Sequence, residues 1–229
     1  TFPEDELERE RAVILQEVDE VEDDPVTMAY HLFDKACWGL HPAALPVIGQ
    51  RRHIERFTRT DLVTTVQRQY TGTNIVVVAA GGIDARAVQR EAANAFAGME
   101  AGTPNLVAPP VFEGGIRSKR MEVGSQTHLV MGFPTPALAE EDAAFEVAAA
   151  IFGDGMSSPL LAELREKRGL VYHAACVADR FDYAGQFVIE ASFAPNKLEE
   201  VLHEVARLLC EQAARIEPVH LERACKQLE

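Results

Sequence analysis

The segment from Gly153 to Tyr172 constrains the fold of this chain more than any other stretch of its 229 residues. It reads Gly-Asp-Gly-Met-Ser-Ser-Pro-Leu-Leu-Ala-Glu-Leu-Arg-Glu-Lys-Arg-Gly-Leu-Val-Tyr. Gly153 and Gly155 permit backbone angles that other residues rarely adopt, so they predict a sharp turn. Ser157 or Ser158 then stands where a side-chain oxygen caps the start of a helix.

The helix that follows this turn is predicted to be short and amphipathic. Leucines form its apolar stripe, and Gly169 stands where a left-handed residue ends a helix. Leu170-Val-Tyr172 then begins a strand. Taken alone, the same pattern also describes a well-capped surface helix that leads into a sheet and has no functional role. The residues expected to face water are Glu163, Arg165, Glu166 and Lys167.

The segment resembles the second-domain signature of the pitrilysin/insulinase family of zinc metallopeptidases, in particular its mitochondrial-processing-peptidase-like branch. There a glycine-rich turn, Ser-Ser and Arg-Glu-Lys-Arg-Gly-Leu-x-Tyr occur together, as they do here. The resemblance implies that Arg165 and Tyr172 reach from the second domain toward substrate bound at the zinc site of the first. Pro159 departs from the arginine that the family usually carries after the two serines, although proline is acceptable in the first turn of a helix.

The composition is that of a globular protein, with 47% hydrophobic and 25% charged residues. The net charge of −14 argues against a nucleic-acid partner, because binding to phosphate needs clustered Lys and Arg. Basic peptides suit an acidic chain better, although acidity also serves solubility alone. The apolar runs are far shorter than the roughly 20 residues of a membrane helix, so no membrane partner is expected.

The cysteines are scattered and form no Cys-x-x-Cys pair, which favours free buried thiols in a reducing compartment such as the cytoplasm. They are Cys37, Cys176, Cys210 and Cys225. The chain begins at Thr1 and not at methionine, so we expect it to be truncated. A signal peptide therefore cannot be sought at this end.

Periodicity and turn signals predict an α+β fold. We expect helices at residues 3–22, 26–38, 58–70, 84–98, 139–152 and 196–216. We expect strands at residues 74–80, 120–123, 127–133, 170–177 and 186–193.

A segment rich in proline and glycine at residues 99–117 is predicted to be a linker. Leu7-Glu8-Arg9 near the start and Leu221-Glu222-Arg223 near the end suggest an internal repeat. The family resemblance implies two homologous sheet-plus-helices domains, each incomplete here. Residues 1–98 would be the back half of the first, zinc-site domain, and residues 118–229 the front half of the second, substrate-supporting domain.

Two acids lie in an apolar row of the first predicted helix. Glu10 and Glu17 are seven residues apart and so share a face with Ile14. Acids in such a row reach water, pair with a cation or bind a metal, and the row alone favours a solvated edge. The segment resembles the family's helix that supplies the third zinc ligand. This resemblance implies that Glu17 binds zinc and that Glu10 supports the site.

The other zinc ligands of the family come from a His-x-x-Glu-His motif, whose glutamate is the general base. None of the seven histidines of this chain opens that motif. Each lone histidine is therefore interpreted as structural or solvated. Zinc is expected in the intact enzyme but not tightly bound by this chain alone, which we expect to hydrolyse nothing.

The leading hypothesis is therefore the central portion of a zinc metalloendopeptidase that cleaves peptides in a chamber between two homologous domains. The resemblance also implies a homodimer or heterodimer. A non-catalytic scaffold or partner subunit of the same family is the alternative, and an unrelated α+β binding domain is a third. Peptide specificity, compartment and the presence of an upstream His-x-x-Glu-His motif are left open by the sequence.

Overall fold

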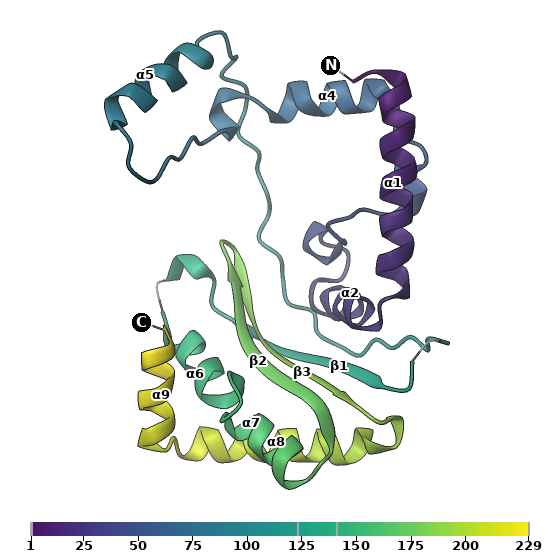
Figure 1. Ribbon diagram of the computed structural model, residues 1–229, viewed down its shortest axis with the longest axis vertical. Coiled ribbons are helices and arrows are strands. Elements are labelled where there is room, and N and C mark those ends of the chain that lie inside the picture. The colour runs from purple at the N-terminus through teal and green to yellow at the C-terminus, as the bar shows by residue number, and fades with distance from the viewer. Residues whose placement is uncertain (1, 123, 141, 229) are drawn as a thin grey trace. The chain divides into compact units, whose positions relative to one another are not determined.

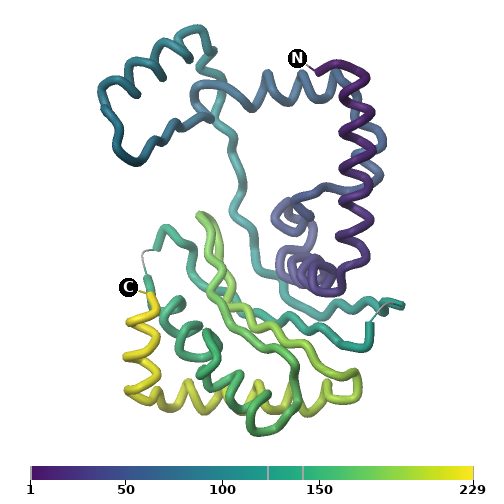
Figure 2. The backbone as a smooth tube through the Cα atoms, viewed as in Figure 1, coloured from purple at the N-terminus to yellow at the C-terminus, as the bar shows by residue number. Residues whose placement is uncertain are grey.

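The computed structural model describes residues 2–122, 124–140 and 142–228, whose path is drawn in Figures 1 and 2. The contacts divide the chain into two compact units. Unit 1 is the chain up to Val18 together with Ile48–Ala108, and unit 2 is Asp19–Val47 together with Pro109–Glu229. The division at Ala108 falls inside the predicted linker, whereas residues 19–47 group with the second unit.

Unit 2 is built on an antiparallel sheet of order β1-β3-β2. Its strands are β1 (Thr127–Thr135), β2 (Val171–Phe181) and β3 (Ala184–Phe193). Its helices are α2 (Pro25–Trp38), α6 (Ala144–Gly153), α7 (Pro159–Leu161), α8 (Leu198–Ala214) and α9 (Pro218–Leu228). Short helical turns are η1 (Pro42–Ala44), η3 (Leu138–Glu140), η5 (Pro195–Lys197) and the π-helical η4 (Ala162–Lys167).

One face of this sheet packs against α6, α7 and α8, which Figure 1 shows on one side of the strands. Successive residues of a strand point to opposite faces, so every second side chain enters this core. Burial of these apolar side chains is the main stabilising contribution to unit 2. Its fully buried members include Leu160, Leu164, Ile189, Phe193 and Val201.

The opposite face of the sheet packs against α2. Phe33, Cys37 and Trp38 form a cluster there with Val188 of β3. The Phe33 ring lies so close to Gly132 that a Cβ atom there would come within 2.5 Å of it, so glycine is required for this approach. Asp24 caps the start of helix α2, and its carboxylate accepts the amide of Thr27 at 2.8 Å.

Unit 1 consists of helices and irregular chain. It contains most of α1 (Glu4–Asp23), together with η2 (Gly72–Asn74), α3 (Arg51–Ile54), α4 (Arg59–Gln69) and α5 (Ala85–Ala95). Thr58 and Asp61 form a reciprocal capping box at the start of α4, and Asp84 accepts the first amides of α5, so both helices begin within one residue of the predicted starts. The class with helices and strands mixed is confirmed, and the interpretation as two homologous domains stays a prediction.

The strand predicted at residues 74–80 is wrong. Residues 75–80 form no secondary structure, and Val76 and Val78 are 86% and 83% exposed. A strand needs a neighbour for its backbone hydrogen bonds, and the residues that the structure describes supply none for this segment. The pattern of branched apolar residues therefore does not by itself specify a strand, because it does not supply the pairing partner.

Other boundaries also differ from the predictions. Residues 120–122 are not in a strand, and position 123 lies outside the described residues. Helix α6 begins five residues later than predicted, after η3, at Ala144. The predicted linker at residues 99–117 forms neither helix nor strand.

The four cysteines are free, and the prediction of buried thiols holds for two of them. Cys37 and Cys176 are buried, whereas Cys210 and Cys225 are exposed. Burial raises the pKa of the Cys37 thiol to about 12, which keeps it protonated. In the described part of the chain we find no helix that combines the length and the apolar character needed to cross a bilayer.

Candidate functional site

Arg165 lies on a π-helical turn and not on a regular α-helix. After one turn of α7, the amide of Arg168 donates to the carbonyl of Glu163 at 3.2 Å, a bond across five residues. Such turns contain one extra residue and occur often at functional sites. The predicted Gly169 terminator is confirmed, because its φ of 61° is left-handed and its amide donates to the carbonyl of Arg165 at 3.0 Å.

Ion pairs anchor this turn to α8. The Glu163 carboxylate accepts from Lys167 at 2.8 Å and from Arg168 at 3.0 Å, and it lies 3.4 Å from the Arg207 guanidinium. The buried Glu204 on α8 pairs with the same two arginines. Lys167 and then Arg168 hold the pKa of Glu163 below its usual range. The turn therefore has a fixed charge network on one side and the buried Leu164 on the other.

The glycine turn before Arg165 is held from α9. Arg223 donates to Ser157 Oγ at 3.1 Å and to the carbonyls of Ala150 and Ile151 at 2.8 and 3.0 Å, so it caps the end of α6. Ser158 is fully buried, and it is this serine that caps α7.

The two glycines of the predicted turn have different roles. Gly155 has a φ of 79°, as predicted for the sharp turn. Gly153 is not in the left-handed region, so the conformational reason predicted for it is wrong. A Cβ atom at Gly153 would lie 2.3 Å from the Cβ atom of Cys176, and close packing against β2 is therefore what requires glycine.

The Arg165 guanidinium is partly exposed and faces the glycine turn. Its Nε donates to Glu166 at 2.7 Å, and its Nη2 lies 3.6 Å from the sulfur of Met156. The side chain keeps 30% of its surface exposed, so part of the guanidinium is open to a ligand. Among the residues predicted to face water, Glu163 is instead largely enclosed by its cations.

Tyr172 lies in a β-bulge at the start of β2. Val171 pairs with Phe193 and His173 pairs with the preceding Ser192, so Tyr172 is the extra residue of β2. Bulges leave one residue unpaired and re-aim its side chain, and they occur often next to active sites. Tyr172 is 59% exposed, and its hydroxyl has no hydrogen-bond partner among the described residues.

Glu10 and Glu17 lie on α1, as predicted, and both are exposed. Neither carboxylate has a hydrogen bond or an ion pair with another described residue. Arg11 between them donates to the Phe57 carbonyl at 2.6 Å and holds α1 against the chain that follows α3. Glu10 and Glu17 belong to unit 1, whereas Arg165 and Tyr172 belong to unit 2.

The described residues bring together no group of three or more His, Cys, Asp or Glu side chains that could hold a metal ion. A catalytic zinc needs three protein ligands and one open position. Glu17 contributes one carboxylate on an exposed helix face, so the residues present do not fit a tightly bound zinc. The described residues therefore supply no zinc site by themselves.

The structure also brings together three residues that the sequence analysis did not connect. His173 Nε2 and Glu190 Oε1 lie 2.8 Å apart, and the Tyr30 hydroxyl donates to Glu190 Oε2 at 2.6 Å. Burial raises the pKa of Glu190, but the bonds from Tyr30 and His173 outweigh it and leave the pKa lowered. The signal in the sequence was the one acid in the predicted strand at residues 186–193.

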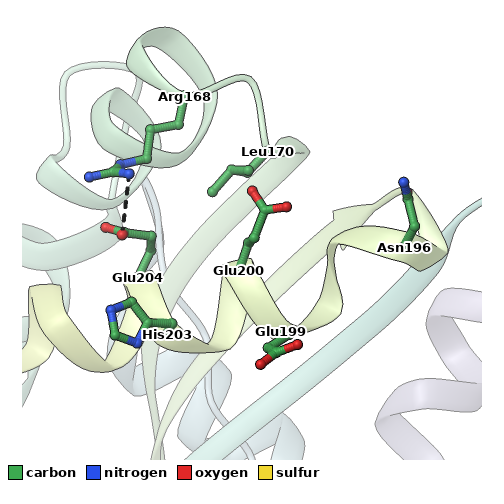
Figure 3. Close-up of a pocket in the computed structure, with 7 residues that line it drawn as sticks. All are labelled: Arg168, Leu170, Asn196, Glu199, Glu200, His203 and Glu204. Carbon is green, nitrogen blue, oxygen red and sulfur yellow. Dashed lines mark ion pairs between the residues drawn. The ribbon is translucent and has the colours of Figure 1, made fainter.

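A cavity of about 340 Å³ lies between the π-helical turn and the start of α8. In Figure 3, Arg168 reaches across to Glu204, and the Glu200 carboxylate points toward Leu170. Glu200 also accepts from Lys197 at 2.8 Å. Arg168, Glu200 and Glu204 each take part in an ion pair, so the geometry indicates a structural network more than a ligand site.

Residues 56–228, which include the π-helical turn and the bulge, match the family described as the peptidase M16 inactive domain. The chain belongs to the peptidase M16 family. The predicted relationship to zinc metallopeptidases is therefore confirmed at the level of the family, and the hypothesis of an unrelated α+β binding domain is wrong.

Relatives and solved structures agree with this membership in M16. A protein of Rickettsia bellii named an uncharacterized zinc protease is 30% identical over 231 residues, which are 99% of this chain and 55% of the relative. The crystal structure of a peptidase M16 inactive domain from Pseudomonas fluorescens has a TM-score of 0.87 at 23% identity and covers 100% of this chain and 56% of that one. A chain of complex III2 from Candida albicans has a TM-score of 0.85 at 18% identity and covers 96% and 55%.

The M16 chain is shorter than the relatives that it matches. It spans about half the length of the curated relatives that it matches. At identities below 25%, the solved structures establish the fold alone. What can be assigned directly is a peptidase-family member with a three-stranded sheet and no metal-binding group among its described residues.

Proposed function

We propose that this chain is the central portion of a zinc-dependent metalloendopeptidase that cleaves peptides in a chamber between two homologous domains. The observation that carries the proposal is the presentation of Arg165 and Tyr172 on special backbone, one on a π-helical turn and one on a bulge. Both side chains keep polar groups open to a ligand, and the segments that bear them are anchored by buried residues on either side. Such preorganised donors suit a role in holding a peptide and its developing oxyanion.

In this proposal Glu17 is a zinc ligand in the intact enzyme and Glu10 supports that site. Two exposed carboxylates without partners, seven residues apart on α1, agree with a face that is completed by residues outside this chain. The acidity of the chain favours basic peptides as substrates. Four free thiols fit a reducing compartment such as the cytoplasm.

A non-catalytic scaffold or partner subunit of the same family is the second candidate, in which the chain joins a homodimer or heterodimer. Two observations favour it: the matching family is described as inactive, and the described residues contain no group of metal ligands. Against it stand Glu10 and Glu17, since a scaffold gains nothing from two unpaired acids on one helix face. The coding sequence upstream of residue 1 separates the two, because His-x-x-Glu-His there supports the peptidase and its absence supports the scaffold.

Peptide binding by the purified chain tests the role of unit 2. The probe is a fluorescein-labelled decapeptide of alternating lysine and leucine, followed by anisotropy. We expect Arg165→Gln and Tyr172→Phe each to weaken binding, with the loss of a charged hydrogen bond at Arg165 giving about tenfold or more. Arg90→Gln is the matched control, because Arg90 also pairs with the next residue, Glu91, and it lies in unit 1. Equal effects of Arg165→Gln and Arg90→Gln would contradict the proposed role.

Peptide cleavage tests the part of the proposal that concerns zinc. We expect the 229-residue chain to leave a quenched fluorescent peptide intact with or without added zinc, because one carboxylate does not hold catalytic zinc. Zinc-dependent cleavage that is abolished by Glu17→Gln would show that the chain is a complete catalyst and would refute the proposal.

A further inference from the structure

The bulge at Tyr172 has an anchor on each side, and the two anchors are of different kinds. Val171 is 5% exposed and lies in the apolar core of unit 2. His173 is largely exposed, and its ring is held by the carboxylate of Glu190 on the neighbouring strand at 2.8 Å. The direction of Tyr172 is therefore set by a buried apolar residue before it and by a hydrogen-bonded polar residue after it.

Glu190 uses both of its carboxylate oxygens. One contacts His173, and the other accepts the Tyr30 hydroxyl of α2 at 2.6 Å. A carboxylate held from both sides has a fixed plane, so a change at the Tyr30 end alters the position of the oxygen that meets His173. We call these three side chains the Tyr30–Glu190–His173 relay.

Helix α2 does not need this relay in order to dock on the sheet. Phe33, Cys37 and Trp38 already pack it against Val188 in an apolar cluster. Partial burial of an acid costs free energy, and an apolar side chain such as that of the opposite residue, Val130, would fill the position without that cost. The relay therefore adds a polar connection where packing alone would suffice for stability.

The relay connects α2 to β2, the strand that carries Tyr172. Tyr30 lies on α2, and His173 directly follows Tyr172 in the bulge. The hydrogen bonds through Glu190 therefore link this helix to the residue next to Tyr172.

We propose that Tyr30, Glu190 and His173 are positioning residues that set the orientation of Tyr172 for peptide binding. This inference rests on the proposed role of Tyr172 in holding a peptide. None of the three residues needs to touch the peptide. Tyr30 lies at the far end of the relay and precedes Tyr172 by 142 positions in the sequence. Loss of its hydrogen bond to Glu190 should change the orientation of Tyr172 without unfolding unit 2.

The test uses Tyr30→Phe, which removes one oxygen atom and keeps the ring that packs edge-on against Phe33. Ring-labelled tyrosine gives an NMR signal for Tyr172, which is assigned by its loss in Tyr172→Phe. We expect Tyr30→Phe and Glu190→Gln to shift this signal. Tyr183→Phe is the control, because Tyr183 is exposed to a similar extent, 52%, and takes no part in the relay.

A double-mutant cycle with the lysine and leucine decapeptide separates positioning from a general loss of stability. We expect Tyr30→Phe to weaken binding several-fold in the native background and to have little further effect in Tyr172→Phe, because the two changes act through one side chain. Cys37→Ala removes packing of α2 in the same apolar cluster and leaves the Phe33 ring and the three relay side chains in place, so it should leave the Tyr172 signal unchanged.

An unmoved Tyr172 signal in both relay variants would overturn the inference, and so would equal losses of affinity in the two backgrounds. If Glu190→Gln does not fold, Tyr30→Phe alone decides. If the decapeptide does not bind the unmodified chain, the proposed role of Tyr172 fails. The inference that the relay orients Tyr172 is then judged on the NMR signal alone.

Discussion

Unit 2 and unit 1 differ in how much of their apolar surface they bury. Unit 2 gathers fully buried side chains such as Leu160 and Phe193 between its sheet and three helices. In the described part of unit 1, the buried residues are Val18, Ile54 and Thr71. The valines at 76–78 remain exposed. Helices form in both units because their hydrogen bonds are local, whereas a core and a sheet need elements that are close in space.

The contrast predicts that unit 2 contributes more to the stability of this chain than unit 1. Unit 2 supplies both the strands and the helices that cover them, so its apolar side chains are buried within the unit. Unit 1 has well-capped helices with little to pack against among the described residues. The following predictions test this contrast, and the single tryptophan, Trp38, lies buried in unit 2 and reports on its unfolding.

Truncation of one phenylalanine in each unit should give the largest contrast. Phe193 is fully buried, so Phe193→Ala should lower the free energy of unfolding by about 3–5 kcal/mol. Phe96 of unit 1 is 42% exposed, and Phe96→Ala should change it by no more than about 0.5 kcal/mol. Urea denaturation followed by far-ultraviolet circular dichroism, which reports on the helices of both units, measures both values, and Trp38 fluorescence assigns the transition of unit 2. A large loss in Phe96→Ala would mean that unit 1 also has a cooperative core.

A pair of glycine substitutions should give the next largest effect. The new Cβ atom of Gly153→Ala would meet Cys176, so overpacking should cost about 1–3 kcal/mol. Gly98 of unit 1 has no atom within 4 Å of the same position, and Gly98→Ala should be neutral or slightly stabilising. Thermal unfolding followed by circular dichroism compares the two, and equal melting temperatures would argue that the glycine turn has room to move.

Removal of a helix cap sharpens the contrast further. Ser158 is buried and accepts the Leu161 amide at 3.3 Å, so Ser158→Ala should cost about 1–2 kcal/mol by leaving that amide without a partner. The corresponding cap in unit 1, Thr58, is exposed, and water can replace it in Thr58→Ala. We therefore expect a smaller loss there by urea denaturation, and the opposite order would contradict the interpretation.

The smallest expected effect is a dependence on pH. The folded state lowers the pKa of Glu190 below its ordinary value of 4.5, so this carboxylate contributes stability above pH 4.5 and loses it as the pH falls through the lower folded-state value. The stability difference between the unmodified chain and Glu190→Gln should shrink between pH 7 and pH 3. Tyr30→Phe keeps the Glu190 carboxylate, so the stability difference between the unmodified chain and this variant should depend less on pH. A difference that grows toward low pH would contradict the assigned sign.

Sequence reasoning recovered the elements whose signals are local. The helices predicted from residues 58 and 84 begin directly after Thr58 and Asp84, and the Ser158 cap and the left-handed Gly169 lie where predicted. The strand predicted at residues 74–80 does not form, because strand pairing depends on a neighbouring strand that the sequence pattern does not specify. Sequence reasoning also assigned Gly153 to a turn, since only the folded chain brings Cys176 against it.

The candidate site was predicted as a set of residues but not as a geometry. Arg165 and Tyr172 followed from a motif, and their roles stay predictions. The extra residue of the π-helical turn and that of the bulge have no signature in the spacing, because each depends on which backbone groups pair. The relay was not predicted either, since Tyr30 and Glu190 are separated by 160 residues.

The sequence by itself determined the family, the helix boundaries set by caps and glycines, and the absence of a His-x-x-Glu-His motif from these residues. These properties depend on residue identity and on interactions within a few positions along the chain. The tertiary structure was needed to show that unit 2 has a buried apolar core and that Tyr172 is an exposed bulge residue without a partner on β3. It also showed that Glu190 connects Tyr30 of α2 to His173 of β2. Those outcomes depend on contacts between distant segments, and the hydrophobic effect and hydrogen bonding select them only when the whole unit folds.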